Sequence, residues 1–291
     1  MTNALATFSK KIESQLVDPL RQVNIGRKLV YVTPAQGFGI SSVEWGKITE
    51  MSDGYVSYGF TSGNEDMIDV ALTNNKIPVY WKDYKVPRRM YESWKVGGVD
   101  IDNAAALSAG YQTVTAEDMA IIQGVKNDGT NYDILGLYQG AGSDYSTSSD
   151  FGTWGNAIKA LAGAKTTMAG YGVPAYNMPL NMVLGFTNYG ELESSVHSTS
   201  GQLEKPIVES MLNGGAIYAV PDTVLPDSDG LVLPTPSVGK AYFDFYLTQN
   251  YTVEHGIDSE HPDTGDLTGR VYSAGILRIK QDKAICKISV I

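Results

Sequence analysis

The densest group of chemistry-bearing side chains in this 291-residue chain lies between Glu254 and Asp263. The segment holds His255 and His261, two of the three histidines, together with several carboxylates. Imidazole and carboxylate groups can bind a transition metal, so a metal-dependent enzyme is one hypothesis. The two histidines are six residues apart, however, which matches neither the four-residue zinc-protease spacing nor a calcium loop. The accompanying glycine, proline and acids favour a solvated turn between two strands, and no metal site is predicted.

The other reactive side chains do not form a catalytic pattern. The single cysteine, Cys286, lies among isoleucines in a predicted terminal strand, where a buried and inert thiol is expected. One cysteine also excludes an intramolecular disulfide and a multi-thiolate metal site. His197 lies in a Ser/Thr-rich loop with no acid beside it, and Gly37 and Gly39 are too few for a dinucleotide fingerprint. We therefore expect no catalytic residues and no cofactor, and a structural or binding role.

The net charge and the hydropathy pattern exclude several classes of binding partner and location. With 22 basic and 32 acidic residues the formal net charge is −10, which disfavours broad binding to nucleic acid or anionic lipid. The first 23 residues lack the continuous apolar stretch of a signal peptide, and no window approaches the roughly 18 apolar residues of a membrane span. We expect a soluble, cytoplasmic protein without a membrane partner.

The elements that would carry a binding surface begin with an N-terminal helix. Leu5, Phe8, Ile12 and Leu16 fall at spacings of three to four, which predicts one apolar helix face, and Pro19 should end or kink the helix. This face could pack on its own subunit or contact a partner, and the pattern leaves both open. Arg27–Val32 then predicts a short strand.

A series of strand-like runs follows between Val43 and Val86. The runs are Tyr55–Phe60, Met67–Leu72 and Ile77–Tyr84, separated by turn clusters, and they predict a long hairpin arm. Alternation in the second run is imperfect, as expected where a strand is covered by something other than its own core. A neighbouring subunit could provide that cover.

Helices and strands alternate in the rest of the chain, which predicts the α+β class. Asp118 falls at the edge of an apolar helix stripe, Thr153 is the expected cap of a later helix, and Lys126–Tyr145 should be mostly loop. The predicted helices are Arg88–Val96, Asp102–Gln123, Trp154–Ala164, one opening after Thr187, and Leu203–Leu212. The predicted strands are Leu180–Gly185, Ala216–Val220, Leu231–Leu233, Ala241–Thr248, Arg270–Ile279 and Ala284–Ile291.

Several short motifs occur in a characteristic order. They are Gly26–Val32 followed by a glycine-containing loop, Ile77-Pro78-Val79 with Lys82-Asp83, Glu117–Gly124 at the end of the long helix, and Leu203–Ile217. In this order the chain resembles the encapsulin (linocin-like) shell proteins, which share the tailed-phage capsid fold. The resemblance extends over most of the chain.

The resemblance implies an α+β, Hong Kong 97-type phage capsid fold with an N-terminal helix, an extended arm (E-loop), a peripheral domain with a long spine helix, and an axial domain. Each part can be given a range in this sequence. The ranges are 1–42 for the N-terminal helix and lead-in strand, 43–86 for the arm, 87–179 for the peripheral domain with the first part of the axial domain, 180–238 for the axial domain, and 239–291 for the closing strands.

The resemblance also implies a function. Many copies would self-assemble into an icosahedral nanocompartment enclosing a cargo enzyme of the ferritin-like or peroxidase type, held through a targeting peptide. The expected arm contacts with neighbouring subunits are Tyr55, Tyr58, Phe60, Ile68, Val70 and Leu72, and the expected cargo-facing helix residues are Phe8, Ile12 and Leu16. The alternative is a viral or proviral major capsid protein that packages nucleic acid in a virion.

Overall fold

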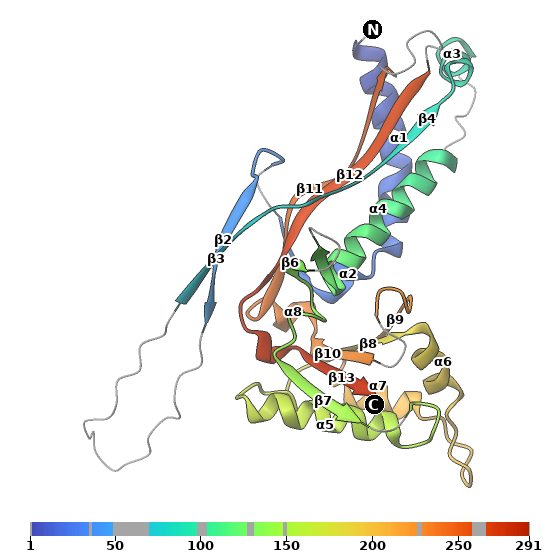
Figure 1. The fold of residues 1–291 in the computed structure, drawn as a ribbon. Helices are drawn as coiled ribbons and strands as arrows, with labels where there is room; N and C mark the ends of the chain where they lie inside the picture. Colours follow the sequence, from blue (N-terminus) through green and yellow to red (C-terminus); the bar gives the residue numbers. More distant parts are fainter. Residues whose placement is uncertain are drawn as a thin grey trace.

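The computed structural model describes residues 2–34, 37–48, 70–97, 104–126, 131–147, 150–225, 229–257 and 266–290. Figure 1 shows an elongated molecule with a long sheet at the N-terminal end, a second sheet at the other end, and a hairpin that leaves the side. The mixture of helices and sheets confirms the predicted α+β class.

The long sheet has four strands in the order β1-β11-β12-β4. The strands are β1 (Tyr31–Pro34), β11 (Phe243–Ile257), β12 (Leu267–Ile279) and β4 (Val79–Val86). Helix α1 (Thr2–Val23) packs on β11, and α4 (Ala104–Ile122) packs on β12 and β4. The two helices thus cover one face of the sheet, while α3 (Arg88–Gly97) follows β4 at its far end.

Two sequence predictions concern the chain around α1. Pro19 does not end the helix, because α1 continues to Val23, with Leu16 and Leu20 fully buried on either side of the proline. Tertiary packing offsets the backbone hydrogen bond that proline cannot donate. Residues predicted as the strand Arg27–Val32 instead form the short helix α2 (Gly26–Leu29) before β1 begins at Tyr31.

The second sheet has five strands in the order β7-β13-β10-β8-β9. It comprises β7 (Ser143–Thr147), β13 (Cys286–Val290), β10 (Asp229–Pro234), β8 (Leu180–Gly185) and β9 (Ile217–Val220). Helices α5 (Asn156–Gly170), α6 (Phe186–Ser194), α7 (Lys205–Met211) and α8 (Pro236–Gly239), with the 3₁₀ turn Asp282–Ala284, surround or connect these strands. Leu161, Met182 and Cys286 belong to the core that joins α5 to this sheet.

Two further predictions in this region are wrong. The segment Lys126–Tyr145, predicted as loop, contains strand residues as well: β5 (Gly124–Lys126) pairs with β6 (Tyr132–Leu135), and β7 pairs in parallel with β13. That second pairing joins residues about 140 positions apart, which local patterns do not reveal. Thr153 does not cap α5; Gly155, with a φ of 89°, occupies the N-cap without a side-chain hydrogen bond.

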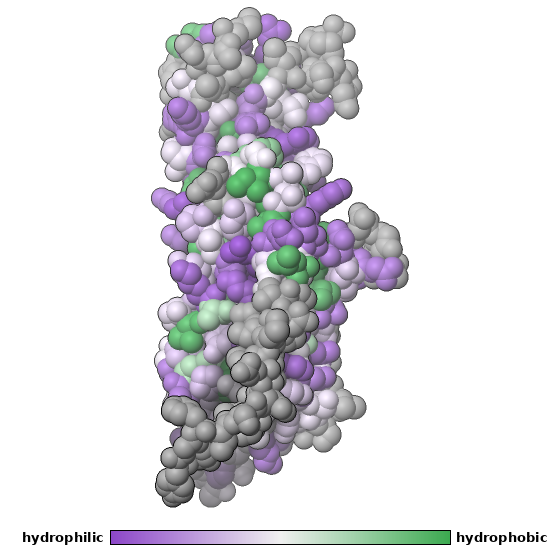
Figure 2. Space-filling view, turned by 90° about the vertical axis from the view of Figure 1, so that its left-hand side faces the viewer, coloured by the Kyte–Doolittle hydropathy of each residue, from purple (hydrophilic) through white to green (hydrophobic). Residues whose placement is uncertain are grey.

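The arm is the hairpin of β2 (Ser42–Ile48) and β3 (Val70–Lys76), paired from Ser42↔Lys76 to Ile48↔Val70. It projects sideways from the long sheet in Figure 1. Strand β4, which falls within the predicted arm range, is instead the edge strand of the long sheet. The predicted run Tyr55–Phe60 lies outside the described residues. Seen from the side on which the arm projects, hydrophobic side chains gather at mid-height among hydrophilic ones (Figure 2).

Candidate functional site

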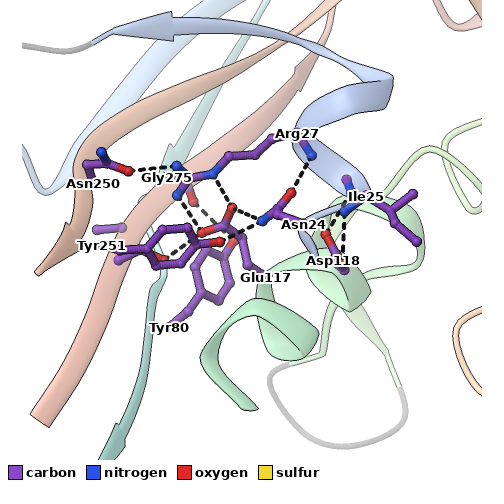
Figure 3. Close-up of polar contacts among 12 residues, drawn as sticks. Asn24, Ile25, Arg27, Tyr80, Glu117, Asp118, Asn250, Tyr251 and Gly275 are labelled. Atoms are coloured by element: carbon purple, nitrogen blue, oxygen red, sulfur yellow. Dashed lines mark hydrogen bonds and ion pairs between the residues drawn. The ribbon is translucent and has the colours of Figure 1, made fainter. Parts of the chain in front are cut away.

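The most strongly organised polar group lies where α1, α4 and the long sheet meet (Figure 3). At its centre is Glu117 of α4, whose side chain is fully buried. Arg27 donates from Nε to Oε1 at 2.5 Å and from Nη2 to Oε2 at 2.8 Å, a two-point pairing that matches the carboxylate geometry. Asn24 donates to Oε1 at 3.0 Å and Ser273 to Oε2 at 2.6 Å. The buried charge is thus both paired and hydrogen-bonded.

Neighbouring side chains extend this cluster to β11. Asn24 Nδ2 donates to the Tyr251 hydroxyl at 2.6 Å, and Arg27 Nη1 donates to Asn250 Oδ1 at 2.8 Å. The Arg27 guanidinium also lies 4.3 Å from the centre of the Tyr251 ring. Burial raises the pKa of Tyr251, so its hydroxyl stays protonated. The cluster fixes four elements, α2 (Gly26–Leu29), α4, β11 and β12, relative to one another.

Asp118, next in sequence, performs a different task. Its carboxylate accepts from the backbone N–H groups of Ile25, at 3.2 Å, and Gly26, at 2.7 Å, and so caps the start of α2. Burial raises its pKa to about 7, against the lowering effect of those two hydrogen bonds. The helical stripe placed Asp118 at its edge but gave no sign that Glu117 is the buried partner of Arg27.

The histidine- and acid-rich segment Glu254–Asp263 has a described part, up to residue 257, and an undescribed part. His255 lies in β11, with Nδ1 at 2.8 Å from Ser9 Oγ and Nε2 at 2.8 Å from Tyr84 Oη, so the ring links α1 to β4. Desolvation lowers its pKa to about 4, which keeps it neutral near pH 7. His261 lies outside the described residues. Within the described residues, no three potential ligands of the His, Cys, Asp or Glu type form a metal-binding group.

The other two candidate reactive residues, Cys286 and His197, make structural contacts. Cys286 is buried, as predicted, and desolvation raises the pKa of its thiol to about 12. His197 accepts at Nδ1 from the backbone N–H of Ser200 at 3.1 Å, and its ring meets Trp154 edge-on at 5.1 Å.

Two contacts of β2 anchor the arm to the rest of the subunit. Trp45 Nε1 donates to the Ile279 carbonyl at 3.2 Å, and Lys47 pairs with Asp282 at 2.5 Å. Leu72, one of the predicted arm contacts, is 69% exposed. Val70 lies in β3, but its side chain, like Tyr55, Tyr58, Phe60 and Ile68, is outside the described residues. Two isolated strands are marginally stable in water, and the Trp45 and Lys47 contacts supply part of the support that this hairpin needs.

The predicted cargo-facing helix needs a correction. The side chains of Ile12 and Leu16 are 1% and 0% exposed and belong to the core formed with Tyr251, Val253 and α4. The apolar face of α1 therefore packs on its own subunit, and these two side chains are not available to a cargo protein. The Phe8 side chain lies outside the described residues.

Among the described helices, none combines the length and apolar character that crossing a membrane requires.

Comparison with known proteins identifies the fold and family. A family model described as "Encapsulating protein for peroxidase" matches residues 4–261. The chain is 27% identical over 288 residues to a diheme-cytochrome-encapsulin shell fusion protein of Kuenenia stuttgartiensis, covering 96% of this chain and 71% of the relative. Among solved structures, the virus-like particle of Pyrococcus furiosus aligns with a TM-score of 0.67 at 18% identity, covering 97% of this chain and 99% of the other. The capsid of Myoviridae phage XM1 aligns with a TM-score of 0.65 at 13% identity, covering 92% of each chain.

These matches confirm the resemblance seen in the sequence and the Hong Kong 97-type capsid fold. The family model covers the N-terminal helix, both strands of the arm, the buried pair Arg27 and Glu117, and most strands of the two sheets. The chain therefore belongs to the encapsulin family and is a self-assembling shell protein with a phage-capsid fold.

Proposed function

We propose that the shell formed by this chain is an icosahedral nanocompartment that encloses a redox enzyme of the peroxidase type. The family description names a peroxidase as the encapsulated protein, and the name of the Kuenenia relative joins a diheme cytochrome to an encapsulin shell. Both names associate the shell with a redox protein. A ferritin-like cargo, the other type predicted from the sequence, remains a hypothesis.

The assembly part of the proposal rests chiefly on the arm. A hairpin that leaves its own sheet and exposes Leu72 gains stability by burying apolar surface on another copy. The arm residues Tyr55, Tyr58, Phe60, Ile68, Val70 and Leu72 are its proposed contacts. Because copies of one chain must meet through repeated contacts, closure of the shell depends on a fixed arm geometry.

Contacts at the base of the arm help to fix its geometry. Trp45 and Lys47 attach β2 to the residues at the end of β12 and in the following turn. The Glu117 cluster in turn fixes α4 and α2 against β11 and β12. We assign the long-sheet region to the peripheral domain and the five-stranded region to the axial domain, with α4 as the spine helix.

For cargo, we propose that a targeting peptide binds on the inner wall beside α1. Ile12 and Leu16 would pack α1 against its own sheet. The opposite face of the helix, which includes the exposed Lys10, Ser14 and Asp18, would contact the peptide. Phe8 remains a predicted cargo contact. We place the assembled compartment in the cytoplasm.

A genome-packaging capsid is the second candidate, because phage capsids share the fold. The family match and the net charge of −10 favour protein cargo. A neighbouring portal, terminase or protease gene would favour the viral alternative.

Coexpression tests the proposal directly. The chain is produced together with a peroxidase that either carries or lacks a candidate targeting peptide at one terminus, and particles are isolated by sedimentation. We expect protease-protected peroxidase in particles only when the peptide is present. Particles filled with nuclease-protected nucleic acid, or peroxidase that never sediments with the shell, would contradict the cargo proposal.

A further inference from the structure

A cavity of about 400 Å³, which we call the arm-base pocket, lies between the base of the arm and the rest of the subunit. The hairpin contributes Trp45 and Lys47 from β2 and Thr73 and Asn75 from β3. Trp45 is paired with Thr73, and side chains alternate between the two faces of a hairpin, so these four residues share one face. The volume falls within the range of roughly 300–1,000 Å³ that is usual for small-molecule sites.

The opposite wall of the pocket is largely apolar. In β6, Asp133 and Leu135 alternate with the buried Ile134 and therefore point to the side of the pocket, where Leu135 is 51% exposed. The apolar residues of this wall are Ile134, Leu135, Ala141, Leu277 and Ile279. Such a surface suits the carbon skeleton of an organic ligand, whereas a bare Mg²⁺ or Ca²⁺ ion requires a set of oxygen ligands.

The polar groups of the pocket divide into paired and unpaired ones. The Lys47 ammonium group lies 2.5 Å from the Asp282 carboxylate, so these two charges compensate each other. Within the described part of the chain, four other lining side chains make no hydrogen bond or ion pair, namely those of Thr73, Asn75, Asp133 and Gln139. Polar groups that converge on a pocket in this way are available to orient a ligand.

The charge of the lining favours a cation. The charged residues that line the pocket are Lys47, Asp133 and Asp282. Because Lys47 and Asp282 cancel, the Asp133 carboxylate leaves one negative charge without a partner. The indole ring of Trp45 also lines the pocket, and aromatic rings attract cations. The net charge of −10 adds a long-range attraction of the same sign.

We propose that the arm-base pocket binds a small organic cation, with its ammonium group beside Asp133 and its apolar body on Leu135 and Ile279. The amides of Asn75 and Gln139 provide hydrogen bonds to further polar groups of the ligand. This site is independent of the proposed cargo. Since its walls come from the arm and from β6 and β12, an occupant also holds the base of the arm in place, and binding and assembly then influence each other.

Three probes of similar size and different charge test the class of ligand. They are phenethylamine, 2-phenylethanol and 3-phenylpropionate, each titrated at neutral pH into the purified full-length protein and followed by saturation-transfer NMR. We expect the amine to bind about fivefold more tightly than the alcohol, and the carboxylate to bind most weakly, since a single exposed ion pair contributes at most about this factor. Equal binding of amine and alcohol would overturn the proposal.

Removal of the charge at Asp133 locates the preference. Asp133→Asn keeps the size of the side chain and should reduce the advantage of the amine over the alcohol to about one. The matched control is Glu44→Gln, which removes one negative charge from the exposed opposite face of β2 and should retain the wild-type preference. An unchanged preference in Asp133→Asn, or the same loss in Glu44→Gln, would show that the amine responds only to net charge and would refute the site.

Filling the pocket provides a test that does not depend on charge. Thr73→Trp places a large ring on the pocket side of β3, where strands tolerate aromatic residues, and should abolish binding of all three probes. Asn74→Trp, on the other face of the same strand, should bind them as the wild type does. Unchanged amine binding by Thr73→Trp would place the site elsewhere.

Negative-stain microscopy and circular dichroism of every variant separate the pocket from the proposed function. A wild type that forms no shells would refute the proposed function itself. Normal wild-type shells that give no saturation transfer to phenethylamine would refute only the arm-base pocket, including the case in which a neighbouring copy fills it.

Discussion

Replacing Glu117 with glutamine should destabilise the subunit more than any change at an exposed ion pair. The substitution keeps the size of the side chain but removes the charge that compensates Arg27, and its amide N–H₂ faces donors on Arg27 and Ser273. Breaking a buried pair by removing one partner costs about 3–5 kcal/mol. Arg27 retains 12% exposure, which favours the lower end, about 3 kcal/mol.

This free energy can be converted to a shift in melting temperature. At about 2.1 cal/mol/K per residue, the unfolding entropy of a chain of this length is roughly 0.6 kcal/mol/K. A loss of about 3 kcal/mol then lowers Tm by about 5 °C. Unfolding is followed by far-UV circular dichroism, with light scattering recorded in parallel to separate shell dissociation from subunit unfolding.

Two further variants make the comparison specific. Glu193 pairs with Lys205 at 2.6 Å but is 51% exposed, so Glu193→Gln should leave Tm nearly unchanged. Adding Arg27→Met to Glu117→Gln removes the uncompensated charge and should restore part of the lost stability. If Glu117→Gln and Glu193→Gln unfold at the same temperature as the wild type, the Glu117 cluster does not hold the fold together as argued.

Three other perturbations have defined outcomes. Deleting residues 54–72 with a short Gly/Ser replacement should give folded subunits, by circular dichroism, that do not assemble; intact shells would show that the arm assignment is wrong. Desolvation lowers the pKa of His255 to about 4, so the free energy of unfolding of the wild type relative to His255→Gln should fall by roughly 2 kcal/mol as pH falls from about 6.5 toward 4; identical pH profiles of the two proteins in parallel urea titrations would contradict this. The pKa of Asp118 is raised to about 7, so its contribution to the free energy of unfolding is largest below about pH 4 and falls by roughly 4 kcal/mol as pH rises through 7. Asp118→Asn should remove this pH dependence, and an unchanged pH dependence in the same urea titrations would refute the prediction.

Local patterns predicted the elements with strong periodicity or clear boundaries. The strand Leu180–Gly185 is found at the predicted residues, because a short apolar run that ends in glycine strongly indicates a buried strand. Helices α3 and α4 differ from their predicted ranges by a few residues at their ends. The buried Cys286 also follows from its isoleucine neighbours.

The missed features depend on contacts distant in sequence. The α2 turn is capped by Asp118, about 92 residues later, and β7 is held by pairing with β13. Glu117 looked like an ordinary helix residue because its partners, Arg27 and Ser273, come from other elements. His255 was grouped with its sequence neighbours, whereas its described partners lie on α1 and β4.

Negative-stain electron microscopy of the purified full-length protein tests the central claim, assembly into a closed shell. Under mild buffer conditions we expect hollow, closed particles of uniform diameter, because identical copies must meet through the same repeated contacts. Monomers, small oligomers or open fibres under all such conditions would contradict the account.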